Sequence, residues 1–167
     1  SGGLPRRLVA IFTSLSPVAT VLSLPVIRSG IEFINYTRRV RAGGRAVYLA
    51  GITPQTIAEF IAFSWIGAAY FLYAPFPWMI KTIPDLIVGT EGLINIAFTV
   101  SAIWGVQSFN TKNVPVTVGL LTGLSVAVVL YGAGTVNYGT GMRHRQMFLW
   151  VIFLFGGIGL SERLRFV

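Results

Sequence analysis

The chain has 167 residues, of which 54% are hydrophobic and only 11% are charged, and its mean hydropathy is +0.73. A soluble domain carries about 25% charged residues, so this chain has too little polar surface to face water. Its net charge is +8, and the lack of cysteine excludes disulfides, thiolate metal sites and cysteine nucleophiles. The composition predicts an all-α, polytopic transmembrane bundle that forms a single domain in a cell or inner membrane.

Five apolar segments are expected to form the helices, at about residues 8–27, 56–73, 86–106, 116–136 and 146–161. A helix needs about 17–25 apolar residues to cross a bilayer. The first segment contains Pro17 and Pro25, which predict a kinked crossing or a re-entrant piece. The last segment is short, so it has to borrow flanking residues, thin the bilayer or stop part-way, which leaves four or five crossings. Gly119 and Gly123 are spaced for the close approach of two membrane helices.

The connections between the segments have their own signals. Residues 28–47 carry five arginines and are expected to form a basic surface loop with a short helix near residues 31–36. Thr56 and Glu59 fit a capping box at the start of the second segment. Pro75 and Pro77 should end that segment, since prolines at this spacing cannot continue a helix.

Basic residues give a predicted sidedness. If all five segments cross, the N-terminus shares one side with the turns before the third and fifth segments. The other side then holds the loop 28–47 and the C-terminus, and it has more of the arginines and lysines: Arg28, Arg38, Arg39, Arg41, Arg45, Lys112, Arg163 and Arg165. The positive-inside rule predicts that this side is cytoplasmic.

The sequence Arg143-His144-Arg145 follows a glycine-rich turn and is the main candidate for chemistry. Glycines let a backbone approach a ligand closely and present its N–H groups. Arginine forks suit phosphate, and the single histidine could act as an acid or a base near neutral pH. The alternative is an interfacial anchor, in which the arginines meet lipid headgroups and fix the depth of the helix.

Glu91 is an ionisable group inside a predicted span, about 10 Å along the helix beyond Pro84. At that depth Arg143 or Arg145 could reach it, either as part of a functional site or as a purely structural ion pair. Asn95 is expected on the same helix face. Asp85 is expected to be a solvated residue of the first helical turn.

Phe76 and Trp78 form a rigid aromatic turn with the neighbouring prolines. With Tyr70 and Tyr73 they fit an interfacial aromatic belt. They could instead form a stacking wall for a sugar ring or an isoprenoid chain.

Three motifs occur in order: YFLYAPFPW at residues 70–78, Glu91-Gly92, and NYGTGMRHR at residues 137–145. This order resembles the C-terminal part of polytopic polysaccharide-assembly membrane proteins of the O-antigen polymerase and ligase type. Members of that group resemble one another in an FxPFPW turn and a late N-x-G-T-x-x-R-H-R turn. Such proteins usually have about twice as many spans, so the resemblance implies a part of a longer protein or a reduced relative that needs a partner.

The resemblance implies transfer of glycan from polyprenyl-diphosphate-linked sugars outside the cytoplasm. Arg143 and Arg145 would contact the diphosphate, His144 or Glu91 would activate the acceptor, and no metal or other cofactor is needed. The expected partners are membrane lipids, a lipid-linked glycan and other membrane protein chains, but not nucleic acid. The alternative is a non-catalytic structural or assembly subunit of a larger membrane complex or a virion membrane. A transporter or channel fragment would need a polar stripe through the spans, which is thin here.

Overall fold

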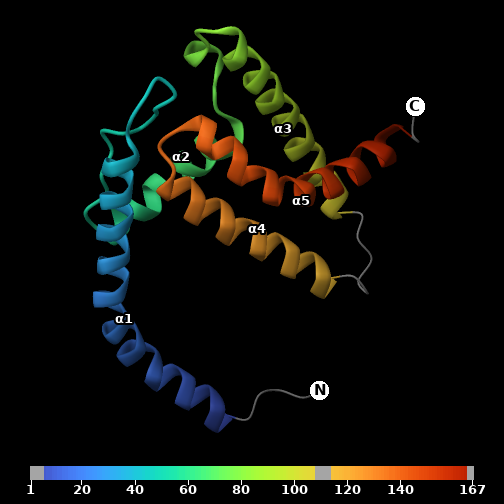
Figure 1. Cartoon of the computed structure of the whole chain (residues 1–167). Helices are drawn as coiled ribbons and strands as arrows, with labels where there is room; N and C mark the ends of the chain where they lie inside the picture. Colours follow the sequence, from blue (N-terminus) through green and yellow to red (C-terminus); the bar gives the residue numbers. More distant parts are fainter. Residues whose placement is uncertain (1–5, 108–113, 165–167) are drawn as a thin grey trace.

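The computed structural model describes residues 6–107 and 114–164, with side chains from residue 24 onward. Its elements are α1 (Arg6–Arg41), α2 (Ile57–Tyr73), a short 3-10 helix η1 (Pro77–Met79), α3 (Ile83–Gln107), α4 (Val114–Gly134) and α5 (Tyr138–Leu164). Within these ranges the only β-type pairing is an isolated bridge between Val47 and Asn137. The predicted all-α helical bundle is therefore confirmed (Figure 1).

Helix α1 is one continuous helix of 36 residues that passes through Pro17 and Pro25. Figure 1 shows that it is bent and that its N-terminal half extends away from the other helices. The predicted basic loop at residues 28–47 is wrong over its first two thirds, because the helix continues to Arg41. It stops before Gly43-Gly44, where Gly44 adopts a φ of +84° that favours glycine. The side chains of the first predicted span lie mostly outside the described residues.

The predicted helices at 56–73, 86–106 and 116–136 are confirmed to within a few residues. Thr56 caps α2 by accepting from the Glu59 N–H at 3.2 Å, and the Glu59 carboxylate accepts from the Gln55 N–H at 2.8 Å. The hydrogen bond from that N–H lowers the pKa of Glu59. The helix ends at Tyr73, before the cis Ala74–Pro75 bond.

Helix α5 is much longer than the predicted segment at 146–161, because it begins at Tyr138 and has 27 residues. The residues Arg143, His144 and Arg145 therefore lie in its second turn and not in a loop. In the described part of the chain, α3, α4 and α5 are long and apolar enough to cross a membrane, and α2, with 17 residues, is shorter. These helices indicate a membrane protein.

Helices α3 and α5 run parallel and meet along glycines. A Cβ added to Gly105 would lie 1.9 Å from the Phe155 carbonyl oxygen, and one added to Gly159 would lie 2.0 Å from the Ser101 oxygen. The backbones are thus in direct contact, as small residues permit. Among the described residues, nothing lies within 4 Å of a Cβ added to Gly119 or Gly123, so the described part of the chain does not use their spacing for such a contact.

Helix α2 lies across the C-terminal end of α4. A Cβ added to Gly67 would be 2.8 Å from the Gly132 oxygen. Phe71 stacks on Tyr131 with 5.9 Å between ring centroids. Two turns earlier, Phe63 lies under the guanidinium of Arg38, which also donates to the Ala133 carbonyl at this end of α4. Both halves of α2 therefore contact the last turns of α4, and α2 does not carry the chain to the far end of the bundle.

The connection between α1 and α2 lies at the same end as the turns that precede α3 and α5. The Tyr48 N–H donates to the Val136 oxygen at 2.9 Å, and the Tyr138 N–H donates to the Ala46 oxygen at 3.0 Å. The predicted sidedness placed this connection opposite both turns, whereas the structure places it beside them, because both ends of α2 lie at this end of the bundle. This end of the bundle, where the three connections meet, is called the cap below.

Candidate functional site

Arg145 is a buried side chain that closes the C-terminus of α2. Its side chain is 1% exposed, and its Nη1 donates to the carbonyls of Leu72 at 3.1 Å and Ala74 at 2.8 Å. The last carbonyls of a helix have no partner inside the helix, so an arginine from another helix can satisfy them. The sequence could not show this pairing, because α2 and Arg145 are separated by some 70 residues.

Glu91 pairs with Arg145, as the depth of the two residues predicted. The Nε of Arg145 donates to Glu91 Oε1 at 3.1 Å, and Gln146 Nε2 donates to the same oxygen at 3.2 Å. Asn95 lies one turn further along α3 and donates to the Leu72 carbonyl at 3.2 Å. The group therefore joins α2, α3 and α5 at one point, and this geometry favours the structural role that was left open for the ion pair.

Arg38 binds the last carbonyls of α4, as Arg145 binds those of α2. It is 1% exposed, and its Nη1 donates to the Ala133 oxygen at 2.9 Å and the Thr135 oxygen at 3.4 Å. Its Nη2 donates to carbonyls of the α1–α2 connection, at Leu49 and Ile52. Sequence analysis counted Arg38 among surface arginines, since nothing local distinguishes it from its neighbours.

Asp85 is the centre of a buried clasp, and the expectation that it is a solvated residue is wrong. It is 2% exposed, forms an ion pair with Arg45 and accepts from the Tyr138 hydroxyl at 2.8 Å. It also accepts from the backbone N–H groups of Lys81 and Thr82. The hydrogen bond to the Asp85 carboxylate raises the pKa of Arg45. A local signal existed, because Thr82 and Asp85 have capping-box spacing before an apolar run.

The predicted aromatic residues form a continuous stack on the cap. Trp78 stacks on Phe76 at 4.9 Å, Phe76 meets the edge of Tyr70 at 5.0 Å, and Tyr70 stacks on Tyr48 at 5.2 Å. Trp78 at the outer end is 72% exposed, whereas Tyr48 is buried, and burial raises the pKa of its hydroxyl. Tyr73 turns away from this stack and donates to Thr99 Oγ1 at 3.2 Å.

The N–H groups of residues 138–141, at the start of α5, are all bonded within the chain. The Oδ1 of Asn137 accepts from the N–H of Gly139 at 2.9 Å and of Thr140 at 3.4 Å. The Asn137 carbonyl accepts from Gly141, and the Tyr138 N–H is bound to Ala46. The first turn of α5 is therefore capped from within the chain.

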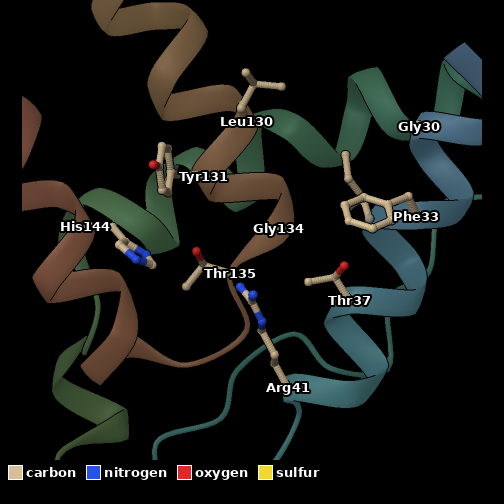
Figure 2. Close-up of a pocket in the computed structure, with 10 residues that line it drawn as sticks. Gly30, Phe33, Thr37, Arg41, Leu130, Tyr131, Gly134, Thr135 and His144 are labelled. Carbon is tan, nitrogen blue, oxygen red and sulfur yellow. The ribbon is translucent and has the colours of Figure 1, made fainter. Parts of the chain in front are cut away.

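Two adjoining hollows lie between α1, the end of α4 and the start of α5, and together they are called the α1 groove. One is about 400 Å³ and mostly apolar, and the other, about 420 Å³, is mostly polar. Both are lined by Arg41, Gly134, Thr135 and His144. Phe33, Ile34, Leu130 and Tyr131 complete the apolar hollow, while Asn137 and Thr140 complete the polar one. Figure 2 shows Arg41 reaching from the end of α1 toward Thr135, with His144 on the opposite wall.

His144 packs against Tyr131, with 5.0 Å between the ring centroids. Its Nδ1 is buried and has no hydrogen-bond partner among the described residues. The volumes of the hollows are typical of small-molecule sites, which lie between about 300 and 1,000 Å³. Because Nδ1 is buried, only the part of the imidazole that lines the two hollows can meet a bound molecule.

The structure does not bring the sequence-predicted site residues to one point. His144 faces α4 and the groove, whereas Arg145 and Glu91 form their pair on the other side of α5. Arg143 is exposed on the same helix, and Phe76 and Trp78 lie in the aromatic stack. Arg41, which lines both hollows, was not singled out by sequence reasoning. Of the basic residues used for sidedness, Lys112 and Arg165 lie outside the described residues.

No protein-family model matches the chain, and no match was found among curated proteins or solved structures.

Proposed function

We propose that the protein is a multi-pass integral membrane protein that acts as part of a glycan polymerase or ligase and uses polyprenyl-diphosphate-linked sugars. The observation that carries the proposal is the α1 groove, which has an apolar half and a polar, basic half with His144 at the border. A lipid-linked sugar has the same division, with an apolar chain joined through phosphate to a polar head. The order of the motifs at residues 70–78, 91–92 and 137–145 supports the choice of this substrate class.

The transfer needs a base and a stabilised leaving group. In the proposed step, His144 takes the proton of the acceptor hydroxyl as the hydroxyl oxygen bonds to the anomeric carbon of the donor sugar. The bond from that carbon to the lipid diphosphate breaks, and the diphosphate leaves with the electron pair. Base catalysis of this kind contributes about 10²–10⁴-fold to a rate. Basic side chains near the groove stabilise the leaving diphosphate without a metal.

Of the two candidate bases, the geometry favours His144. Glu91 accepts two hydrogen bonds on the far side of α5, and Arg145 is buried beneath the end of α2. Arg143 is exposed and lines neither hollow, so its assignment to the diphosphate rests on the motif at residues 137–145. We therefore assign base catalysis to His144 and contact with the diphosphate to Arg143. Glu91 and Arg145 form a structural ion pair that joins the helices.

The test is glycan chain length in cells that depend on this protein for polymer. We expect His144→Gln and Arg143→Gln to shorten or abolish the polymer. The matched control is Arg39→Gln, since Arg39 is also an exposed cap arginine but does not line the groove. Each variant is compared at equal membrane abundance and with its thermal unfolding midpoint measured in detergent. Polymer of normal length from a folded His144→Gln variant would rule out the assigned chemistry.

A non-catalytic assembly subunit is the second candidate, and one specific observation favours it. Gly119 and Gly123 have nothing within 4 Å, and the adjacent side chains Val116, Val118 and Val126 are more than half exposed. In a membrane, such a face suits another helix. Gly119→Leu should then release stoichiometric protein partners while the isolated chain stays folded. Loss of partners without any change in polymer would favour this second candidate over the first.

A further inference from the structure

We infer that the polar half of the α1 groove is a phosphate site formed by Arg41 and His144, and that its ligand is the phosphate group of an isoprenyl lipid phosphate or diphosphate. The inference rests on the proposed function, because it concerns the same groove. It adds Arg41 to the residues that hold the phosphate. The motif assigns Arg143 to the diphosphate, whereas Arg41 lines both hollows and Arg143 lines neither.

Arg41 is a cationic side chain with no hydrogen bond or ion pair to a described residue. Of the neighbouring arginines, Arg38 binds carbonyls and Arg45 binds Asp85, and Arg39 is exposed but lines neither hollow. No Asp or Glu lines either hollow. The positive charge of Arg41 is therefore not compensated inside the groove, and an anion fits there.

The groups around Arg41 suit phosphate oxygens. Thr135 and Thr140 contribute hydroxyls that can donate, and His144 in its protonated form adds a second charged donor. The backbone N–H groups of the α5 start are already used, so the site does not depend on a helix N-terminus. Charge-assisted hydrogen bonds to an oxyanion are about twice as strong as neutral ones.

The apolar half of the groove explains why a lipid phosphate fits better than a free one. It continues from Thr37 and Tyr131 along α1 to Phe33 and Gly30. Figure 2 shows these α1 residues facing Leu130 and Tyr131 of α4. Phe33 is 69% exposed, and nothing lies within 4 Å of a Cβ added to Gly30. A chain can therefore leave the groove sideways between α1 and α4, where the bilayer would lie.

The experiment measures binding to the purified full chain in detergent micelles, with farnesyl phosphate as the probe. Farnesol tests whether the phosphate matters, and inorganic phosphate tests whether the chain matters. We expect farnesyl phosphate to bind at least tenfold more tightly than either, in line with the worth of a hydrogen bond to a charged group. Arg41→Gln and His144→Gln should each weaken the binding about tenfold, and Arg39→Gln should leave it within twofold.

Three results would overturn the inference. Equal binding of farnesyl phosphate and farnesol, or equal effects of Arg41→Gln and Arg39→Gln, would remove the phosphate site. If inorganic phosphate binds as tightly as farnesyl phosphate, the apolar chain is not recognised and the groove is a site for free phosphate. Arg41-dependent binding of farnesyl phosphate, together with normal polymer in the His144→Gln cells, would support this site and reject the glycan-transfer function.

Discussion

The hydroxyl of Tyr138 donates a hydrogen bond of 2.8 Å to Asp85, and this bond joins the first residue of α5 to the first turn of α3. Arg45 binds the other carboxylate oxygen of Asp85 from the α1–α2 connection. Three connections that are far apart in the sequence are thus held by one buried carboxylate. The parallel pair α3 and α5 is fixed at this end by the clasp and further along by direct glycine contacts.

The clasp predicts coupling between Arg45 and Asp85. Arg45→Gln leaves a buried carboxylate without its countercharge, and Asp85→Asn removes the charge that Arg45 binds. Because the Arg45 side chain is 50% exposed, solvent screens part of the pair. We expect each variant to lower the free energy of unfolding, and the double variant to lose less than the sum of the two single losses. Glu32→Gln is the control, as Glu32 is exposed. Strictly additive effects would contradict the clasp.

The closure of α2 by Arg145 predicts that lysine cannot replace this arginine. A lysine ammonium has no planar fork and cannot serve Glu91 and the Leu72 and Ala74 carbonyls together. We expect Arg145→Lys to cost roughly 2–4 kcal/mol of folding free energy, read as a lower thermal unfolding midpoint in detergent. Arg143 lies two residues earlier on α5 and is exposed, so Arg143→Lys should not change the midpoint. A stable Arg145→Lys protein that fails only in glycan assembly would instead assign Arg145 to the substrate.

The glycine contacts predict opposite outcomes for the same substitution in two places. Gly105→Ala would put a methyl group 1.9 Å from the Phe155 carbonyl oxygen, so α3 and α5 must separate. Overpacking of this kind costs about 1–3 kcal/mol. Gly119→Ala meets nothing within 4 Å and should be neutral or stabilise the isolated chain by up to about 1 kcal/mol. Thermal unfolding of both variants gives the comparison, and equal destabilisation would contradict the α3–α5 contact.

The position of the α1–α2 connection predicts labelling from one side of the membrane. The chain has no native cysteine, so single cysteines can be placed without background. Arg39→Cys, Lys81→Cys and Arg143→Cys should react with an impermeant maleimide from the same side. Ser161→Cys, near the other end of α5, should react from the opposite side. Labelling of Arg39→Cys together with Ser161→Cys would restore the sidedness that the sequence alone predicted.

Much of the fold could be predicted from local patterns. Apolar runs, the Thr56 cap and the prolines after Tyr73 located α2, α3 and α4, because helix formation and helix ends depend on near neighbours in the sequence. The continuation of α1 to Arg41 was missed, because its arginines suggested a loop although arginine is a good helix former.

The contacts in the cap, where the three connections meet, could not be predicted in the same way. Besides their local bonds, Arg38, Asp85 and Arg145 each bind a partner 40 or more residues away, and no local pattern encodes such pairs. The spacing of Gly119 and Gly123 shows the same limit. A glycine spacing shows that a helix permits close contact, but the contact itself depends on which helix lies beside it.

The bond between Arg38 and Ala133 has a consequence for biogenesis, because the two residues are 95 positions apart. A ribosome completes α1 long before the end of α4 exists. Until then Nη1 of Arg38 has no Ala133 or Thr135 carbonyl to bind, although Nη2 can already bind the Leu49 and Ile52 carbonyls of the α1–α2 connection. The wall of the groove that α1 forms with the end of α4 can therefore be fixed only after α4 has been made.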